Sequence, residues 1–177
     1  MSSASKVNIL LVDDQPEKLI AHEAVLEGLG ENIIKVDSGF KALEYLLKNQ
    51  CAVIVLDVNM PGMDGFETAT LIRQRPSLER TPIIFVSGHN VSELDRLTGY
   101  GIGAVDYLSI PVIPEVLRAK VQVFVELFRQ KQIIADQARD LTQQTKTAVQ
   151  AARKEASKPA ARKRSTAMTP PARRRER

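Results

Sequence analysis

The sequence has little cysteine and no long apolar run, and each shortage excludes a class of protein. One cysteine, Cys51, in 177 residues cannot form an intrachain disulfide, so the fold must depend on a packed core in a reducing compartment. No apolar run approaches the roughly 20 residues that a transmembrane helix needs. Residues 1–6 lack the basic and apolar segments of a signal peptide. These absences predict a cytoplasmic protein.

Charge is divided unevenly along the chain. Residues 1–128 carry 11 basic and 17 acidic side chains, a net charge of −6, whereas residues 129–177 carry 14 and 4, a net charge of +10. The length suits one ordinary domain with an extension. We therefore expect a domain over residues 6–128, a helical segment over 129–156 and a separate basic tail over 157–177.

Five short apolar segments alternate with segments of helical periodicity. The predicted strands are 7–12, 33–36, 53–57, 82–86 and 104–108, and the predicted helices are 16 to about 27, 38–48, 66–73, 91–100 and 114 onward. This alternation is typical of a parallel sheet with right-handed crossovers. The sequence therefore predicts an α/β fold, a five-stranded parallel doubly wound sheet of the flavodoxin-like type, followed by a C-terminal helical extension.

The apolar spacing also predicts which helical residues face the sheet. In the helix over 38–48 these are Phe40, Leu43, Leu46 and Leu47. In the helix from residue 114 they are Val116, Leu117, Val121, Phe124 and Phe128. Asp64 is predicted to cap the helix over 66–73.

Polar side chains follow three of the predicted strands. Asp13 and Asp14 end the first strand, Asp57 the third and Ser87 the fourth, and the carboxyl ends of parallel strands share one edge. Three neighbouring carboxylates repel one another, and Mg²⁺ is the hard cation that best relieves this. A carboxylate beside such an ion can attack phosphorus to form an acyl phosphate. The alternative is structural, with Asp14 as a helix cap and Asp57 as the start of a turn.

Four motifs resemble the receiver domain of response regulators. They are L-V-D-D at 11–14, L-D-V-N-M-P-G-M-D-G at 56–65, V-S-G at 86–88 and G-A-V-D-Y-L at 103–108, and the match covers residues 6 to about 128. The resemblance implies that Asp57 is the phosphoacceptor and that a histidine kinase or phosphotransfer protein is the partner.

The resemblance also implies roles for the neighbouring residues. Asp14, Asp57 and the Asn59 carbonyl would bind Mg²⁺, with Asp13 assisting through water. Ser87 would be the switch hydroxyl and Tyr107 the aromatic residue that moves with it. Asn59 and His89 would flank the phosphoryl group and tune its hydrolysis, although His89 also fits an exposed loop histidine.

One residue departs from the family pattern. The family normally has Lys-Pro after the fifth strand, whereas this chain has Ile110-Pro111, so the ammonium that would pair with the phosphoryl oxygens is missing there. Two outcomes are open. Phosphotransfer to Asp57 persists because Mg²⁺ carries most of the charge, or the chain is a degenerate receiver that is regulated by protein contacts alone.

The segment after residue 128 continues the helical pattern. Leu127, Ile134, Leu141 and Ala148 are one heptad apart, and Ala138, Thr145 and Ala152 fill the alternate positions. This thin seam predicts a parallel dimeric coiled coil, the alternative being a fraying helix that orders only with a partner. The tail over 157–177 is predicted to be disordered. Its clusters at 162–164 and 173–175 could attract nucleic acid, but a solubilising role is favoured because no aromatic residue lies among the charges.

The leading hypothesis is a phosphoacceptor switch at Asp57 that signals through protein contacts. The alternative is a docking or dimerisation module that is never phosphorylated, which Ile110 supports. A phosphatase with an aspartyl nucleophile would need a second aspartate two residues after the first, and Gln15 stands there. The chain is therefore predicted not to be an enzyme.

Overall fold

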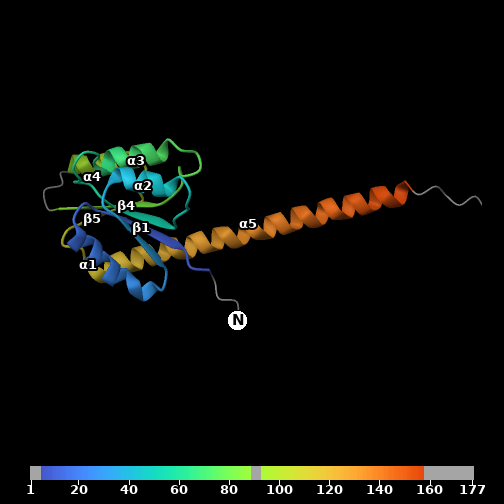
Figure 1. Cartoon of the computed structure of the whole chain (residues 1–177), viewed down its shortest axis with the longest axis horizontal. Coiled ribbons are helices and arrows are strands. Elements are labelled where there is room, and N and C mark those ends of the chain that lie inside the picture. The colour runs from blue at the N-terminus through green and yellow to red at the C-terminus, as the bar shows by residue number, and fades with distance from the viewer. Residues whose placement is uncertain (1–4, 89–92, 158–177) are drawn as a thin grey trace, which may run out of the picture. The chain divides into compact units, whose positions relative to one another are not determined.

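The computed structural model describes residues 5–88 and 93–157 (Figure 1). Contacts divide the chain into two compact units, the first ending at Ile134 and the second beginning at Ala135. The predicted site residue His89, the first two positions of the helix predicted over 91–100, and the basic clusters of the tail lie outside the described residues.

The first unit is built on a parallel sheet. Its strands are β1 Asn8–Val12, β2 Asn32–Val36, β3 Val53–Asp57, β4 Ile83–Ser87 and β5 Asp106–Ser109. They lie in the order β2-β1-β3-β4-β5, with every pairing parallel. All residues of β3 and β4 are buried, which explains their continuous apolar sequences. The predicted five-stranded parallel α/β fold is confirmed.

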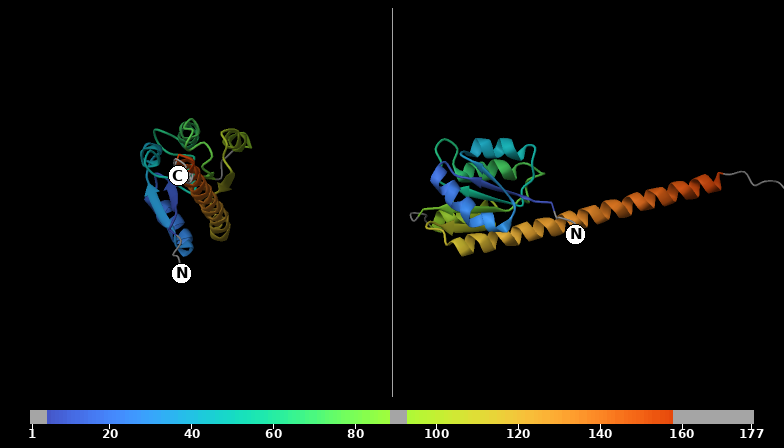
Figure 2. Two further views of the ribbon diagram at one scale, coloured as in Figure 1. Left: turned by 90° about the vertical axis from the view of Figure 1, so that its right-hand side faces the viewer. Right: turned by 60° about the horizontal axis from the view of Figure 1, so that its bottom comes forward.

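Helices cover both faces of this sheet (Figure 2). They are α1 Pro16–Leu26, the 3₁₀ turn η1 Glu27–Leu29, α2 Gly39–Leu46, α3 Gly65–Arg73, α4 Glu93–Gly101 and α5 Pro114–Ala156. Successive strand residues point to opposite faces of the sheet, so their side chains belong to two separate hydrophobic cores. Leu56 and Phe85 pack with residues of α2 and α3, whereas Val55 and Ile84 pack with residues of α1 and α5.

Single residues with a strong local preference set several helix ends. Pro16 begins α1, where a missing backbone N–H costs nothing. The Asp64 carboxylate accepts a hydrogen bond from the Glu67 N–H at 2.8 Å, which confirms the predicted cap of α3. Gly30 ends the turn after α1 with φ of 72°, a left-handed conformation that favours glycine.

Some inward-facing residues were predicted wrongly. Phe40 and Leu47 are 69% and 61% exposed, whereas Ala42 and Leu46 are buried. Because successive helical residues are about 100° apart, Phe40 and Leu47 lie more than a quarter turn from the stripe formed by Gly39, Ala42 and Leu46. The prediction assigned both residues to the core because they are large and apolar, although their positions are off the buried stripe.

A similar error affects α5. Val116 is 36% exposed, and Val125, which was not predicted, is 3% exposed. The buried residues Leu117, Val121 and Val125 recur every four positions, so one row of side chains faces the sheet. Phe124 and Phe128 are partly buried against the same core, as predicted.

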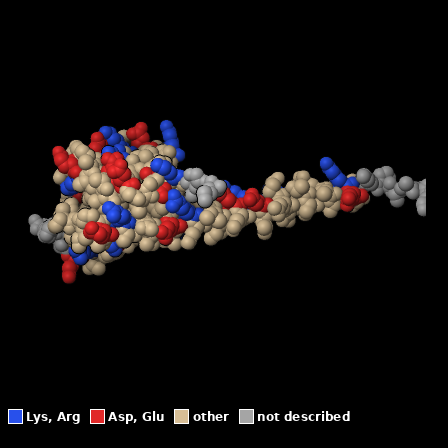
Figure 3. Space-filling view, turned by 90° about the horizontal axis from the view of Figure 1, so that it is seen from below, with Lys and Arg blue, Asp and Glu red and all other residues tan. Residues whose placement is uncertain are grey.

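The second unit contains the C-terminal part of α5. Its described residues are all exposed, and Leu141 has 69% of its surface accessible. Uncharged side chains cover much of its visible face, whereas charges of both signs are mixed over the first unit (Figure 3). In the part of the chain that the structure describes, no helix is long and apolar enough to cross a membrane. The coiled coil stays a prediction, with its seam residues facing solvent.

Candidate functional site

Strand pairing brings the predicted acidic residues together. β1 is followed by Asp13 and Asp14, and its pairing of Val12 with Leu56 places them beside Asp57 at the end of β3. One carboxylate oxygen from each aspartate lies within 4.8 Å of the other two. The sequence-based expectation that these groups share one edge of the sheet agrees with this geometry.

Two of the three carboxylates are largely removed from water, and Asp14 is partly exposed. Asp13 and Asp57 are each 2% exposed. Burial and, to a lesser degree, the charge of Asp13 raise the pKa of Asp57 to about 6, against the opposing effect of the Lys18 ammonium. Burial also raises the pKa of Asp13, although the Gln15 N–H, which donates to its Oδ1 at 2.9 Å, works in the opposite direction.

Three oxygens in this cluster could bind a cation. Asp13 Oδ2, Asp14 Oδ1 and Asp57 Oδ2 are buried and accept no hydrogen bond from any residue that the structure describes. Buried carboxylate oxygens without donors are costly unless a positive charge approaches them. The residues present therefore fit a hard divalent cation, which prefers oxygen ligands.

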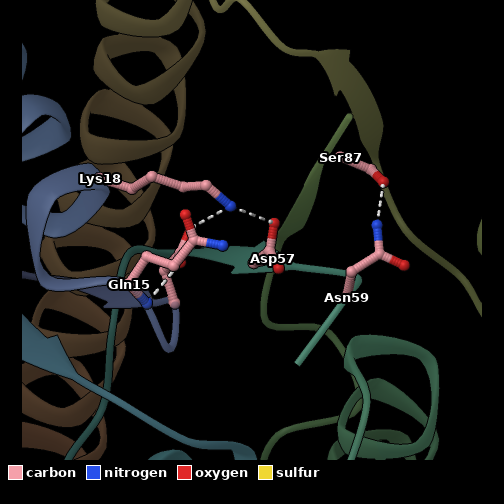
Figure 4. A network of polar contacts seen from close by, with 6 residues as sticks. Gln15, Lys18, Asp57, Asn59 and Ser87 are labelled. Carbon is pink, nitrogen blue, oxygen red and sulfur yellow. Dashed lines mark hydrogen bonds and ion pairs between the residues drawn. The ribbon is translucent and has the colours of Figure 1, made fainter. Parts of the chain in front are cut away.

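A lysine that sequence reasoning missed reaches into the same cluster. Lys18 Nζ lies 3.5 Å from Asp13 Oδ2 and 3.5 Å from Asp57 Oδ1 (Figure 4). The residue belongs to the first turn of α1, which begins three residues after Asp13. Long helical side chains point back toward the helix N-terminus, so this position directs the ammonium to the strand ends. That placement is the sequence signal that could have identified it.

The hydroxyl predicted as a switch lies on the other side of Asp57. Ser87 is fully buried, and its Oγ accepts a hydrogen bond from Asn59 Nδ2 at 3.0 Å (Figure 4). Tyr107 is 8% exposed, and burial raises its pKa. Its ring lies 6.0 Å from that of Phe85, and the Arg96 guanidinium carbon lies 5.7 Å from the Tyr107 centroid. Asn59 and Ser87 are thus directly linked, and Tyr107 packs behind them on β5.

Ile110 lies close to this cluster from the α1 side. Its N–H donates to the Ser87 carbonyl at 2.8 Å. Its side chain and the Lys18 side chain line the same cavity of about 250 Å³, whose other lining residues are Ala21, His22, Val25, Val112, Pro114 and Leu117. The isoleucine in the place of the family's lysine therefore has a lysine from a different element as its neighbour.

Comparison with known proteins gives a consistent picture. Residues 9–122 match the response regulator receiver domain. The chain is 34% identical over 139 residues to a probable cyclic di-GMP phosphodiesterase of Vibrio cholerae serotype O1, covering 77% of this chain and 31% of that protein. It is 37% identical over 120 residues to the transcriptional regulatory protein YvrH of Bacillus subtilis, covering 67% of this chain and 49% of that protein.

Solved structures show the same similarity in three dimensions. The chemotaxis protein CheY4 of Vibrio cholerae matches with a TM-score of 0.63 and 29% sequence identity, over 68% of this chain and 99% of that one. The chain spans half or less of the two curated relatives, 31% and 49% of their lengths. The similarity therefore concerns the part of each relative that this chain matches.

Proposed function

Because the chain belongs to the response regulator receiver family, we propose that it is a phosphoacceptor switch in which Asp57 takes up a phosphoryl group. The observation that carries the proposal is the place of Asp57. Its carboxylate ends the central strand, with one oxygen that accepts no hydrogen bond from the described residues and two further aspartates within reach. Receiver domains are generally not enzymes, and the phosphodiesterase name belongs to a relative of which this chain covers 31%.

The surrounding residues define the chemistry that the site would perform. We expect Asp14, Asp57 and the Asn59 carbonyl to hold Mg²⁺, with Asp13 acting through water. A bound magnesium ion would supply positive charge for the phosphoryl oxygens. Asp57 would attack phosphorus through a carboxylate oxygen, and the bond from phosphorus to the donor's leaving group would break. Burial of Asp57 keeps competing water away from the acyl phosphate.

The neighbouring hydroxyl offers a route from chemistry to signal. The Ser87 hydroxyl can bond the new phosphoryl oxygens after it exchanges its present partner, Asn59. Tyr107 packs against Phe85 beside it and would repack as Ser87 moves. We propose that a histidine kinase or phosphotransfer protein donates the phosphoryl group, and that the changed surface of α4 and β5 passes the signal to a protein partner.

The first test measures phosphoryl uptake directly. We expect acetyl phosphate with Mg²⁺ to add one phosphoryl group to the wild type, as read by intact mass. Asp57→Asn removes the nucleophile, so it should show no adduct, and chelation of Mg²⁺ should suppress uptake by the wild type. Asp37→Asn is the matched control, because Asp37 is an exposed aspartate whose partner is Lys41. A wild type that binds Mg²⁺ but gains no adduct from this donor or from a cognate kinase would instead identify a docking module.

The exposed seam on α5 supports a second proposal, that two copies dimerise as a parallel coiled coil. Ile134 and Leu141 are 65% and 69% exposed, which is unfavourable for a helix that stays single. We expect sedimentation at tens of micromolar to show a dimer, and Leu141→Glu to convert it to a monomer. Gln143→Glu is the control, since it adds the same charge on the opposite side of the predicted seam. A wild type that is strictly monomeric contradicts the coiled coil.

A further inference from the structure

We propose that Lys18 is a catalytic residue that supplies, from α1, the cation for the phosphoryl group on Asp57; this inference rests on the proposed function. The Lys18 ammonium bridges the carboxylates of Asp13 and Asp57. The ammonium lies 3.5 Å from a carboxylate oxygen of Asp57 and 3.5 Å from one of Asp13, both residues being 2% exposed. Among the residues that the structure describes, no other Lys or Arg forms an ion pair with either carboxylate.

The position of the ammonium suits the product of the reaction. A phosphoryl group on Asp57 places new anionic oxygens next to the carboxylate, and the Lys18 ammonium is already in contact with that carboxylate. Lysine carries a compact charge with three donors, so it can keep Asp13 as one partner and bond a phosphoryl oxygen with another. A cation that is positioned before the charge develops lowers the barrier without reorganisation.

Ile110 explains why this cation comes from α1. The Lys18 side chain and Ile110 line one mainly apolar cavity, so the isoleucine lies in the surroundings of the chain that carries the ammonium. A lysine at both positions would bring two ammonium groups to one small site, where like charges repel. Exchange of lysine for isoleucine at position 110 and the presence of lysine at position 18 therefore form one compensated arrangement.

Lys18 leaves part of the metal site open, because it pairs with Asp57 Oδ1 and Asp13 Oδ2 but not with Asp57 Oδ2. It forms no ion pair with Asp14 in the described structure, and Asp14 Oδ1 accepts no hydrogen bond there. The ammonium therefore does not occupy every carboxylate of the cluster. Asp14 and the second oxygen of Asp57 therefore stay open to a metal ion beside the ammonium.

The chemical step balances without any further reactant. An oxygen of Asp57 attacks the phosphorus of acetyl phosphate, the bond from phosphorus to the acetyl oxygen breaks, and acetate leaves with the electron pair. Lys18 remains protonated throughout. Its role is to attract the phosphoryl oxygens as the group is transferred.

The test compares phosphoryl uptake from acetyl phosphate over a range of Mg²⁺ concentrations up to saturation, measured by intact mass. Lys18→Met keeps the length of the stem and removes the charge, and it should slow uptake at least about tenfold, a conservative figure for loss of one charged donor. Lys18→Arg should retain part of the rate. Lys41→Met is the control, because Lys41 pairs with Asp37 on the surface. The double variant Lys18→Met/Ile110→Lys should recover much of the rate, since it supplies one ammonium from the position where the family normally has lysine.

The outcomes show whether the role of Lys18 fails alone or together with the phosphoacceptor function of Asp57. Uptake by Lys18→Met within about twofold of the wild type would overturn the role of Lys18 and leave the phosphoacceptor intact. A rate that returns to the wild-type value when more Mg²⁺ is added would show that Lys18 acts only through metal binding, which also overturns it. A wild type without any adduct overturns both. If Lys18→Met fails to fold by circular dichroism, Lys18→Gln and the double variant give the same comparison.

Discussion

Replacing Gly65 with alanine is expected to lower the free energy of unfolding by about 3 kcal/mol and to slow phosphoryl uptake. A Cβ at this position would lie 2.3 Å from the Asp57 carbonyl oxygen and 2.8 Å from the Val58 Cα. Both are backbone atoms of the central strand region, so no side chain can rotate away. The start of α3 must then move from β3, at a cost near the upper end for overpacking.

Movement of α3 away from β3 would also disturb the turn that follows Asp57. The Gly65 N–H donates to the Val58 carbonyl at 2.9 Å, a contact that holds the turn after Asp57. Chemical denaturation and acetyl phosphate uptake measure the two effects on one protein. Gly28→Ala is the control, because a Cβ there meets nothing within 4 Å; it should leave uptake unchanged and stability within about 1 kcal/mol. Equal stability of the two variants would contradict the close approach of α3.

Replacing Asp57 with asparagine is expected to stabilise the metal-free protein by about 2 kcal/mol at pH 7. The pKa of Asp57 is raised to about 6 in the fold, against about 3.9 in an unfolded chain. Ionising it in the folded state above that pH therefore costs about 3 kcal/mol relative to the unfolded state. The attraction of Lys18 is already contained in that pKa, and a buried asparagine amide without a full set of hydrogen-bond partners offsets part of the gain.

The pH dependence fixes the sign of this effect. Below about pH 4 the carboxyl is protonated in both states, so its contribution to the difference between wild type and Asp57→Asn should vanish. As pH rises from about 4 to about 6 the unfolded carboxyl ionises while the folded one still holds its proton, so the wild type loses stability relative to the variant, and the loss is complete once the folded carboxyl ionises. Denaturation curves at pH 4 and pH 7 with a chelator measure this. An equal difference at the two pH values would show that the carboxylate is not strained by burial.

Magnesium should reverse the order of stability. A cation that binds the folded wild type adds stability according to its concentration and affinity. Asp57→Asn removes one ligand, so it should gain less from the same Mg²⁺. Repeating the pH 7 denaturation with Mg²⁺ gives this comparison. Asp37→Asn changes an exposed residue away from the site, so it should gain as much stability from Mg²⁺ as the wild type does.

The sequence predicted the sheet and the meeting of its carboxylates because both follow from local patterns. Val53 to Asp57 is an apolar run that ends on a carboxylate, and parallel strands align such ends whatever the details of packing. The same reasoning covered Asp13, Asp14 and Ser87. No packing information was required beyond the rule that these edges coincide.

Features that depend on side-chain direction could not be predicted in this way. The place of Lys18 in the first turn after Asp13 is a signal in the sequence, but its 3.5 Å contacts with Asp13 and Asp57 are fixed only when α1 packs beside the sheet. Phe40 was assigned to the core on its hydrophobicity, yet the helix phase that Gly39 and Ala42 set turns it to solvent. The hydrogen bond between Asn59 and Ser87 joins the loop after β3 to the last residue of β4, and its geometry is fixed only once β3 and β4 are paired.

The order of strands in the sheet also has a consequence for the newly made chain. The central strand bearing Asp57 lies between the first strand, which precedes it in the sequence, and the fourth, which follows it. A ribosome must therefore release the segment through Ser87 before all the reactive groups can meet. A half-synthesised or partly unfolded molecule lacks the complete pocket. A phosphate donor would therefore meet a complete site only after translation has passed Ser87 and the sheet has formed.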